Sequence, residues 1–221
     1  MFGIDLLLLI ALALYITYQM IFGKRGPTVE AIAHKHGLKY SEAISQLPPA
    51  FRAIDMLKKG RKHRYNHVVE GHYQGYRILA FQFVYETVDL ELETTTHWYS
   101  IAVVHLPVSC PEVKIHPEHV GHRLANLLGF QDINFESMDF SNAFRVLSKN
   151  KRFAYDVCNP RMMEYLLKKP KTTLEIENEV LAIWEEGHLS GDSLIPLLDH
   201  AVALRKNIPD VVFSHPELPT T

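Results

Sequence analysis

Three histidines stand three residues apart between residues 116 and 122. Imidazole is a common metal ligand, and a step of three residues keeps neighbouring side chains close on a helix. A predicted helix over residues 117–128 would let two of His116, His119 and His122 share a metal ion. The pattern favours surface or helix-capping histidines, because the three side chains drift around the helix over two steps of this size. Metal binding in support of hydrolysis is the alternative.

A second motif contains a serine that could act as a nucleophile. Gly191-Asp192-Ser193-Leu194 resembles the signature of the GDSL esterase and lipase family, in which that serine attacks the ester. The family places its motif near the start of the domain and an Asp-x-x-His pair far downstream. Only 28 residues follow Ser193, and Asp199 is adjacent to His200. A helix N-cap at Asp192 or Ser193 accounts for the same letters without chemistry.

The remaining reactive side chains form weaker patterns. Asp89, Glu91 and Glu93 alternate, so their carboxylates would share one face of an extended chain and could hold a hard cation. They lack the ligand spacing of a known calcium loop, which favours a solvated hairpin. Cys110 and Cys158 belong to no paired-cysteine motif and are expected to be structural thiols. The sequence therefore predicts no cofactor and more readily a binding protein than an enzyme.

A basic stretch lies just before the first long strand pattern. Its five cations are Lys58, Lys59, Arg61, Lys62 and Arg64. Residues 24–64 carry ten Lys or Arg and three acids, whereas residues 65–221 carry thirteen Lys or Arg and twenty-one acids. A basic segment near a membrane attracts anionic lipid headgroups, by roughly 1 kcal/mol per cation. The alternative is a solvated loop, and the acidic remainder argues against nucleic acid as a partner.

The apolar segment at residues 4–22 would position everything that follows. It predicts one transmembrane helix, with residues 1–23 as an anchor, because 17 residues from Leu6 to Phe22 are just long enough to span a bilayer. No Lys or Arg precedes this segment, which argues against a cleaved signal peptide. Its apolar side chains include Leu6, Leu7, Leu8, Leu9, Ile10, Leu12, Leu14, Ile16, Ile21 and Phe22.

The flanking charges predict the orientation of this anchor. Only Asp5 precedes the apolar segment, whereas Lys24, Arg25, Lys35 and Lys39 follow it. Positive charge near a membrane exit favours the cytoplasmic side. We therefore expect a single-pass protein of the cell inner (plasma) membrane, with its N-terminus out and its C-terminal domain in the cytoplasm.

The rest of the chain predicts an α+β domain. Residues 24–64 read as a basic juxtamembrane helical segment, with helices at 28–36 and 48–59 and another turn at 41–47. Strand patterns at residues 65–73 and 76–87 flank a Gln74-Gly75 turn, and a third strand from Thr94 to Leu106 ends at Pro107 and Pro111. These strands predict an antiparallel β-meander with packed helices over residues 65–207. Residues 208–221 read as a flexible tail.

The later elements are predicted from shorter patterns. A strand is expected at residues 144–148 and another around 133–135, with helices at 150–158 and 161–168. Residues 173–177 and 179–184 read as a second hairpin that turns at Asn178. The last long helix would begin at Asp192 or Ser193. Its apolar stripe is Leu194, Leu197, Leu198, Ala201 and Leu204.

The layout also resembles a group of known proteins. The segments that carry the likeness are residues 71–75, the strand to Tyr85, and residues 132–135, 140–144 and 159–163. With them the chain is similar to uncharacterised bacterial single-pass membrane proteins that have a cytosolic α+β domain. The resemblance implies location and fold class only, because such proteins carry no established activity.

These patterns together lead to one functional hypothesis and one alternative. The hypothesis is a membrane-anchored cytoplasmic domain that binds or scaffolds an unidentified protein partner at the inner membrane. Its motivation is the single anchor, the basic segment beside it and the acidic domain that follows. The alternative is a membrane-tethered hydrolase of unrecognised class that uses a metal held by His116, His119 and His122.

Overall fold

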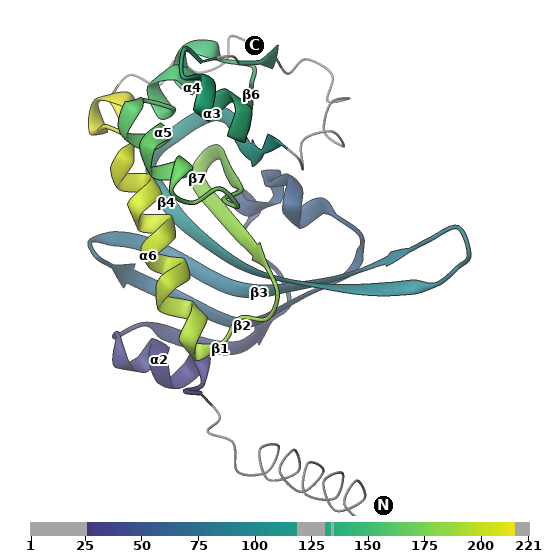
Figure 1. The fold of residues 1–221 in the computed structure, drawn as a ribbon. Coiled ribbons are helices and arrows are strands. Elements are labelled where there is room, and N and C mark those ends of the chain that lie inside the picture. Colours follow the sequence, from purple (N-terminus) through teal and green to yellow (C-terminus); the bar gives the residue numbers. More distant parts are fainter. Residues whose placement is uncertain (1–25, 119–130, 134, 215–221) are drawn as a thin grey trace, which may run out of the picture.

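The chain folds as an α+β domain around one antiparallel sheet. The computed structural model describes residues 26–118, 131–133 and 135–214. Seven strands form the sheet in the order β1-β2-β3-β4-β6-β5, and β7 pairs with β4 away from this path (Figure 1). The strands are β1 (Lys39–Ile44), β2 (Arg61–Tyr73), β3 (Tyr76–Val88), β4 (Thr94–Pro117), β5 (Gln131–Asp132), β6 (Phe144–Ser148) and β7 (Leu174–Glu186).

The predicted α+β class with an antiparallel sheet is confirmed. The α-helices are α2 (Val29–Lys35), α3 (Met138–Ala143), α4 (Lys151–Val157), α5 (Pro160–Leu167) and α6 (Gly191–Asn207). None of the helices in the described ranges is both long and apolar enough to cross a membrane. The anchor predicted at residues 1–23 lies outside the described residues, as does most of the helix predicted at 117–128.

The hairpin of β2 and β3 forms where the sequence predicts it. Gln74 and Gly75 join the strands with φ angles of 49° and 86°. A two-residue turn with both φ angles positive matches the right-handed twist of its strands, and glycine adopts such angles without strain. The prediction of this hairpin is confirmed.

Strand β4 does not end at its prolines, so its predicted boundary is wrong. It continues to Pro117, and its pairing with β7 shifts register between His105 and Cys110 and again between Cys110 and Val113. A proline cannot donate to the ladder, so it is tolerated where the ladder is interrupted. Pro107 and Pro111 lie in these interrupted stretches, which is why the strand survives them.

The second hairpin predicted around Asn178 is wrong. Leu174 to Glu186 is one strand, and Asn178 lies opposite Cys110 with a φ of 52°. Asparagine is among the few residues that adopt this left-handed conformation readily, so it suits a bulge as well as a turn. After the bulge, the odd-numbered and even-numbered side chains of β7 exchange faces of the sheet.

The segment predicted as juxtamembrane and helical contributes to the sheet. Residues 39–44 form β1, paired with β2, where the sequence predicts another helical turn. The helix predicted from Pro48 to Lys59 is instead two 3-10 helices, η1 (Pro49–Ala53) and η2 (Asp55–Lys58), separated by Ile54. Arg61 already begins β2. Only α2 forms as an α-helix near its predicted bounds.

The helices after the sheet form close to their predicted positions. Asn150 and Asn159 cap α4 and α5 through their side-chain oxygens. Helix α6 begins earlier than predicted, because Ser190 is its N-cap and exchanges hydrogen bonds with Ser193 in a capping box. Its predicted apolar stripe is confirmed: Leu194, Leu197, Leu198, Ala201 and Leu204 are all buried.

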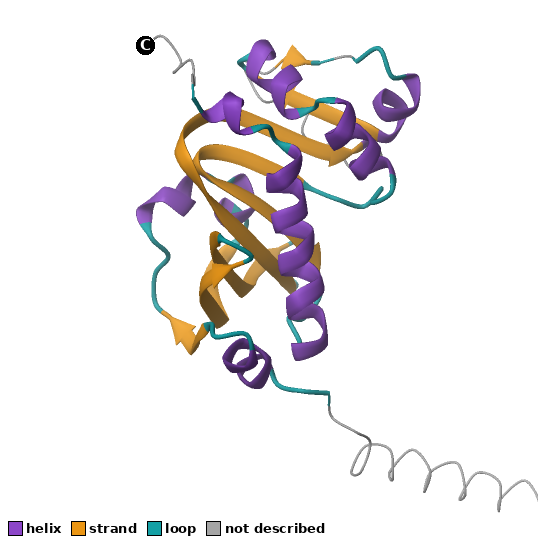
Figure 2. Ribbon diagram, turned by 90° about the vertical axis from the view of Figure 1, so that its left-hand side faces the viewer, coloured by secondary structure: helices purple, strands orange, loops and turns teal. Residues whose placement is uncertain are grey.

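Two apolar cores lie on opposite faces of the sheet. The larger packs α2, α4, α5 and α6 against one face (Figure 2). The smaller lies between the other face and the 3-10 helices, where Phe51 and Ile54 of the η1–η2 segment meet Phe81, Phe83 and other sheet residues. A short 3-10 segment covers less of a sheet than a long helix does. The pocket described below opens on the face that this segment covers.

Candidate functional site

His116 lies inside the protein and not at the start of a helix. It is in β4, opposite Arg145 of β6, and only 5% of its surface is exposed. Burial, with the nearby Lys114 ammonium, lowers its pKa to about 4, so the ring is neutral near pH 7. Its Nε2 atom has no hydrogen-bond partner among the described residues. His119 and His122 lie outside those residues, so the shared metal remains a prediction.

A buried ammonium group, that of Lys114, lies among carboxylates beside η2. Lys114 Nζ is bonded to Asp55, lies 2.6 Å from Glu112 and 3.9 Å from Glu175. The Lys114 and Glu175 side chains are 3% and 1% exposed. Lys114 and Glu175 are direct partners in the β4–β7 ladder, and the sheet alternation turns Val113 away into the larger core. These four ionisable residues, Lys114, Asp55, Glu112 and Glu175, are called the Lys114 cluster.

Burial sets the protonation of this cluster. It raises the pKa of Glu175 to about 8, although the Lys114 ammonium opposes the rise. The backbone N–H of Asp55 donates to both carboxyl oxygens of Glu175, at 3.2 and 3.1 Å. Burial would also raise the pKa of Asp55, but hydrogen bonds from Lys114 and Lys58 outweigh it and lower that pKa. Asp55 is therefore the ionised partner of Lys114, and Glu175 is largely protonated at neutral pH.

The Lys114 cluster joins η2 to the sheet. One oxygen each from Asp55, Glu112 and Glu175 lies within 4.8 Å of the others, a spacing that suits a small hard cation. The ammonium of Lys114 already lies among these oxygens and offsets part of their negative charge. Its contacts make the cluster an internal salt-bridge network, in which η2 contributes Asp55, β4 contributes Glu112 and β7 contributes Glu175.

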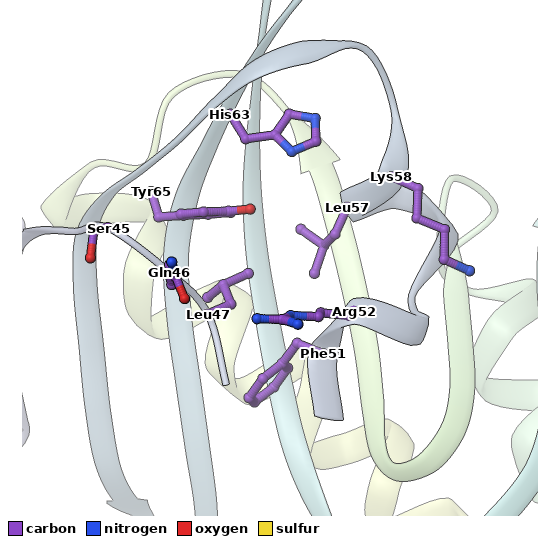
Figure 3. Close-up of a pocket in the computed structure, with 9 residues that line it drawn as sticks. All are labelled: Ser45, Gln46, Leu47, Phe51, Arg52, Leu57, Lys58, His63 and Tyr65. Atoms are coloured by element: carbon purple, nitrogen blue, oxygen red, sulfur yellow. The ribbon is translucent and has the colours of Figure 1, made fainter. Parts of the chain in front are cut away.

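A pocket of about 300 Å³ opens on the same face of the sheet (Figure 3). It lies between the end of β1, the two 3-10 helices and the start of β2. Phe51, Leu47 and Leu57 give it buried apolar walls. The residues that line it are Ser45, Gln46, Leu47, Phe51, Arg52, Leu57, Lys58, His63 and Tyr65.

The third feature is the tip of the β3–β4 hairpin, which reaches out beyond the rest of the sheet (Figure 1). Leu90 and Leu92 are 102% and 82% exposed there. The Asp89 carboxylate accepts hydrogen bonds from the backbone N–H groups of Glu91 and Glu93, both at 2.9 Å. The predicted carboxylates thus lie in an exposed turn, and one of them holds the turn together. Residues 89–93 are called the leucine tip.

The predicted basic stretch extends from η2 into β2. Lys58 pairs with Asp55 at 2.8 Å and Lys62 with Glu86 at 2.8 Å. Arg61 and Arg64 have exposed side chains on β2. The structure places Lys58 at the edge of the pocket, and binding of this stretch to lipid headgroups remains a prediction.

The serine and cysteine candidates have structural surroundings. Ser193 Oγ accepts from the backbone N–H of Ser190 at 2.9 Å and donates to the carbonyl oxygen of that residue at 3.2 Å, as expected of a capping box. Cys110 and Cys158 are buried free thiols, as predicted. Burial raises the pKa of Cys110 to about 11 and raises that of Cys158 further, so both remain protonated thiols.

Sequence reasoning missed the Lys114 cluster and the pocket. Charged residues alternate with apolar ones around Lys114 and around Glu175, which would have indicated one charged face on both strands. That signal is hidden when β4 is expected to end at Pro107 and β7 to turn at Asn178. No local pattern indicates the pocket, since its lining comes from four separate segments.

Comparisons with known proteins support the fold. No family model matches the chain, and no curated protein matches it. Among solved structures, the crystal structure of the mycobacterial trehalose monomycolate transport factor A, TtfA, is similar, with a TM-score of 0.58 and 14% sequence identity. The match covers 82% of this chain and 94% of that chain. At this identity the likeness shows that the two proteins share an α+β fold.

Proposed function

We propose that this chain is a membrane-anchored, non-enzymatic module that binds a partner protein at the cytoplasmic face of a bacterial inner membrane. The apolar segment at residues 1–23 would supply the anchor. The observation that carries the proposal is the leucine tip, where two leucines are held in solvent at the end of a projecting hairpin.

Exposed leucines on an ordered turn are suited to binding. Burying one leucine side chain gains about 1.5–3 kcal/mol relative to leaving it in water. The hydrogen bonds of Asp89 hold the backbone of the tip in place, and Leu92 has a φ of 65°. An ordered loop loses less conformational entropy on binding than a flexible one. The tip therefore presents two apolar anchors that are already arranged.

The charges of the leucine tip indicate what kind of partner surface would be complementary to it. Asp89, Glu91 and Glu93 alternate with the leucines. A complementary surface would be an apolar pocket bordered by lysines or arginines. This composition favours a basic protein surface over an anionic membrane, because carboxylates are repelled by anionic headgroups.

The similarity to TtfA supports an accessory role. TtfA is a transport factor for trehalose monomycolate. A shared fold is compatible with a module that assists another protein, and it transfers neither substrate nor partner. The metal-dependent hydrolase through His116, His119 and His122 remains a prediction.

Site-specific photo-crosslinking in cells tests the proposal. A photoreactive amino acid replaces Leu90 in the full-length chain, and the same amino acid replaces Val211 as a control, because Val211 is also exposed, at 69%. We expect one discrete protein adduct from position 90 and none of that size from position 211. Leu92→Ser and the pair Glu91→Lys and Glu93→Lys should each reduce the adduct, since they remove an anchor and reverse the charge.

Two outcomes would contradict this function. One is an adduct pattern at position 90 that matches the pattern at position 211. The other is an adduct that persists unchanged in the Leu92→Ser and charge-reversed chains. The circular dichroism spectrum of each variant checks that its fold is retained.

A further inference from the structure

The pocket beside η1 contains a cation that no carboxylate balances. Arg52 of η1 lines the pocket, and none of the acidic side chains in the described part of the chain pairs with it. Lys58 differs, because its ammonium is bonded to Asp55 and points away from the pocket (Figure 3). An unpaired guanidinium at a pocket can bind a planar or tetrahedral oxyanion through two parallel hydrogen bonds.

Neutral polar groups surround this guanidinium. The Tyr65 hydroxyl points into the space above Arg52, and Ser45 and Gln46 lie at the side towards β1 (Figure 3). Arg52 is close enough to Tyr65 to oppose the rise in pKa that burial gives that hydroxyl. Hydroxyl and amide groups are hydrogen-bond donors that can meet further oxygens of an anion. None of the nine lining residues in this described region is acidic.

Apolar side chains line the pocket around Arg52 (Figure 3). Phe51, Leu47 and Leu57 are 1%, 8% and 7% exposed and form its wall and floor. The Tyr65 ring stacks on Phe83 with centroids 5.6 Å apart, which fixes its orientation. Ligand pockets combine such apolar walls with a few polar groups that determine orientation. A bound molecule would therefore have a charged end and a hydrocarbon part.

We propose that this pocket binds a phosphate ester that carries an apolar group. Arg52 would bind the phosphate together with the Tyr65 hydroxyl, and the apolar group would lie against Phe51, Leu47 and Leu57. Six lysines and arginines stand against one acid between residues 45 and 65, so the local field attracts an anion. The lining contains no residue of the leucine tip, so the site does not depend on the proposed protein partner.

Calorimetry on the full-length protein in nanodiscs of zwitterionic lipid tests this site. The probes are hexyl phosphate, inorganic phosphate and hexanol. We expect hexyl phosphate to bind at least about tenfold more tightly than inorganic phosphate, because only the ester fills the apolar side. Hexanol should not bind measurably.

Three variants separate the pocket from general surface charge. Arg52→Gln removes the unpaired cation and should weaken hexyl phosphate binding about tenfold or more. Arg64→Gln removes an exposed cation of the same basic stretch outside the pocket, and should change affinity by about twofold or less. Ser45→Trp places a large side chain at the exposed rim and should block the ester while sparing the core.

The results distinguish the proposal from its rivals. If Arg52→Gln and Arg64→Gln weakened hexyl phosphate binding equally, surface charge alone would explain the binding and the proposal would be overturned. Equal affinities for hexyl phosphate and inorganic phosphate would also overturn it, as would absence of binding by a wild-type chain that unfolds cooperatively. Unchanged thermal unfolding of Arg52→Gln shows that lost binding is not lost folding.

A final binding experiment identifies the source of the phosphate ester. Nanodiscs that contain phosphatidic acid should reduce the apparent affinity for hexyl phosphate if a membrane headgroup reaches the pocket. An unchanged affinity with bound hexyl phosphate would support a soluble phosphate ester as the occupant. Both results require the pocket to bind the ester, and both therefore support the site.

Discussion

Glu175 shows how one buried side chain couples the fold to pH. Its carboxyl group is enclosed by η2 and β4 and has a pKa raised to about 8 from an ordinary value of 4.5. Asp55, beside it, has a lowered pKa because it bonds to both Lys114 and Lys58. The surroundings thus shift the pKa values of Asp55 and Glu175 in opposite directions. Of these two carboxyl groups, Glu175 is the one that changes charge near neutral pH.

We expect Glu175 to lower the stability of the folded chain as the pH rises from 5 to 8. In this range the folded chain retains a proton that the unfolded chain has released, so unfolding becomes more favourable with rising pH, by at most about 1.4 kcal/mol per pH unit. Glu175→Gln cannot titrate but keeps an acceptor for Asp55. The free energy of unfolding in urea should therefore shift in favour of this variant as the pH increases.

The matched control for this experiment is Glu164→Gln. Glu164 is an exposed carboxylate of α5 and pairs at 2.8 Å with Lys168, the residue that caps the end of that helix. We expect no change in the pH dependence of its unfolding between pH 5 and pH 8. A stability difference between Glu175→Gln and wild type that stayed constant over this range would contradict the assignment.

The strands show how far the elements could be predicted. The Gln74-Gly75 turn was predictable because its residue types meet the conformational demand of that turn. The continuation of β4 through Pro107 was not predictable, because it depends on where the pairing of β4 with β7 is interrupted and where it resumes. Asn178 was expected at a turn and does have a positive φ angle, but a local sequence pattern cannot distinguish a turn from a bulge. Fold class was therefore predictable, whereas the Lys114 cluster depended on long-range pairing.

The start of α6 depends on close packing against the segment before α2. A Cβ atom on Gly191 would collide with the backbone carbonyl oxygen of Pro27 and lie 2.9 Å from that of Thr28. Gly191→Ala should therefore destabilise the protein by about 1–3 kcal/mol, as in other overpacked sites. Urea unfolding monitored by tryptophan fluorescence measures this loss.

Asp192→Ala is the neighbouring control. Asp192 is exposed in the first turn of α6 and its carboxylate lies beside Gly26, so its loss removes a favourable interaction with the helix dipole, about 0.3–1 kcal/mol, and relieves rather than creates crowding against this segment. A Gly191→Ala chain as stable as wild type would show that the two segments can separate without cost. That result would contradict the close contact between α6 and Pro27.

At the scale of the whole molecule, the prediction that matters most is the anchor. We expect the full-length chain to remain in the membrane pellet after carbonate extraction, and a chain without residues 1–23 to move to the supernatant. The physical reason is the transfer of 17 consecutive, mostly apolar residues into hydrocarbon. Recovery of the full-length chain in the supernatant would contradict the anchor and the proposed location.

The projecting hairpin has a geometric consequence for occupancy. Phe83 stacks against Tyr65 at the pocket, and Leu90 follows Phe83 by seven positions along β3 and its turn. At about 3.3 Å per residue, the chain between them extends over roughly 20 Å. A partner seated on the leucines therefore need not cover the pocket mouth. If both proposals hold, one copy of the chain would bind two different molecules at once, and each would raise the local concentration of the other.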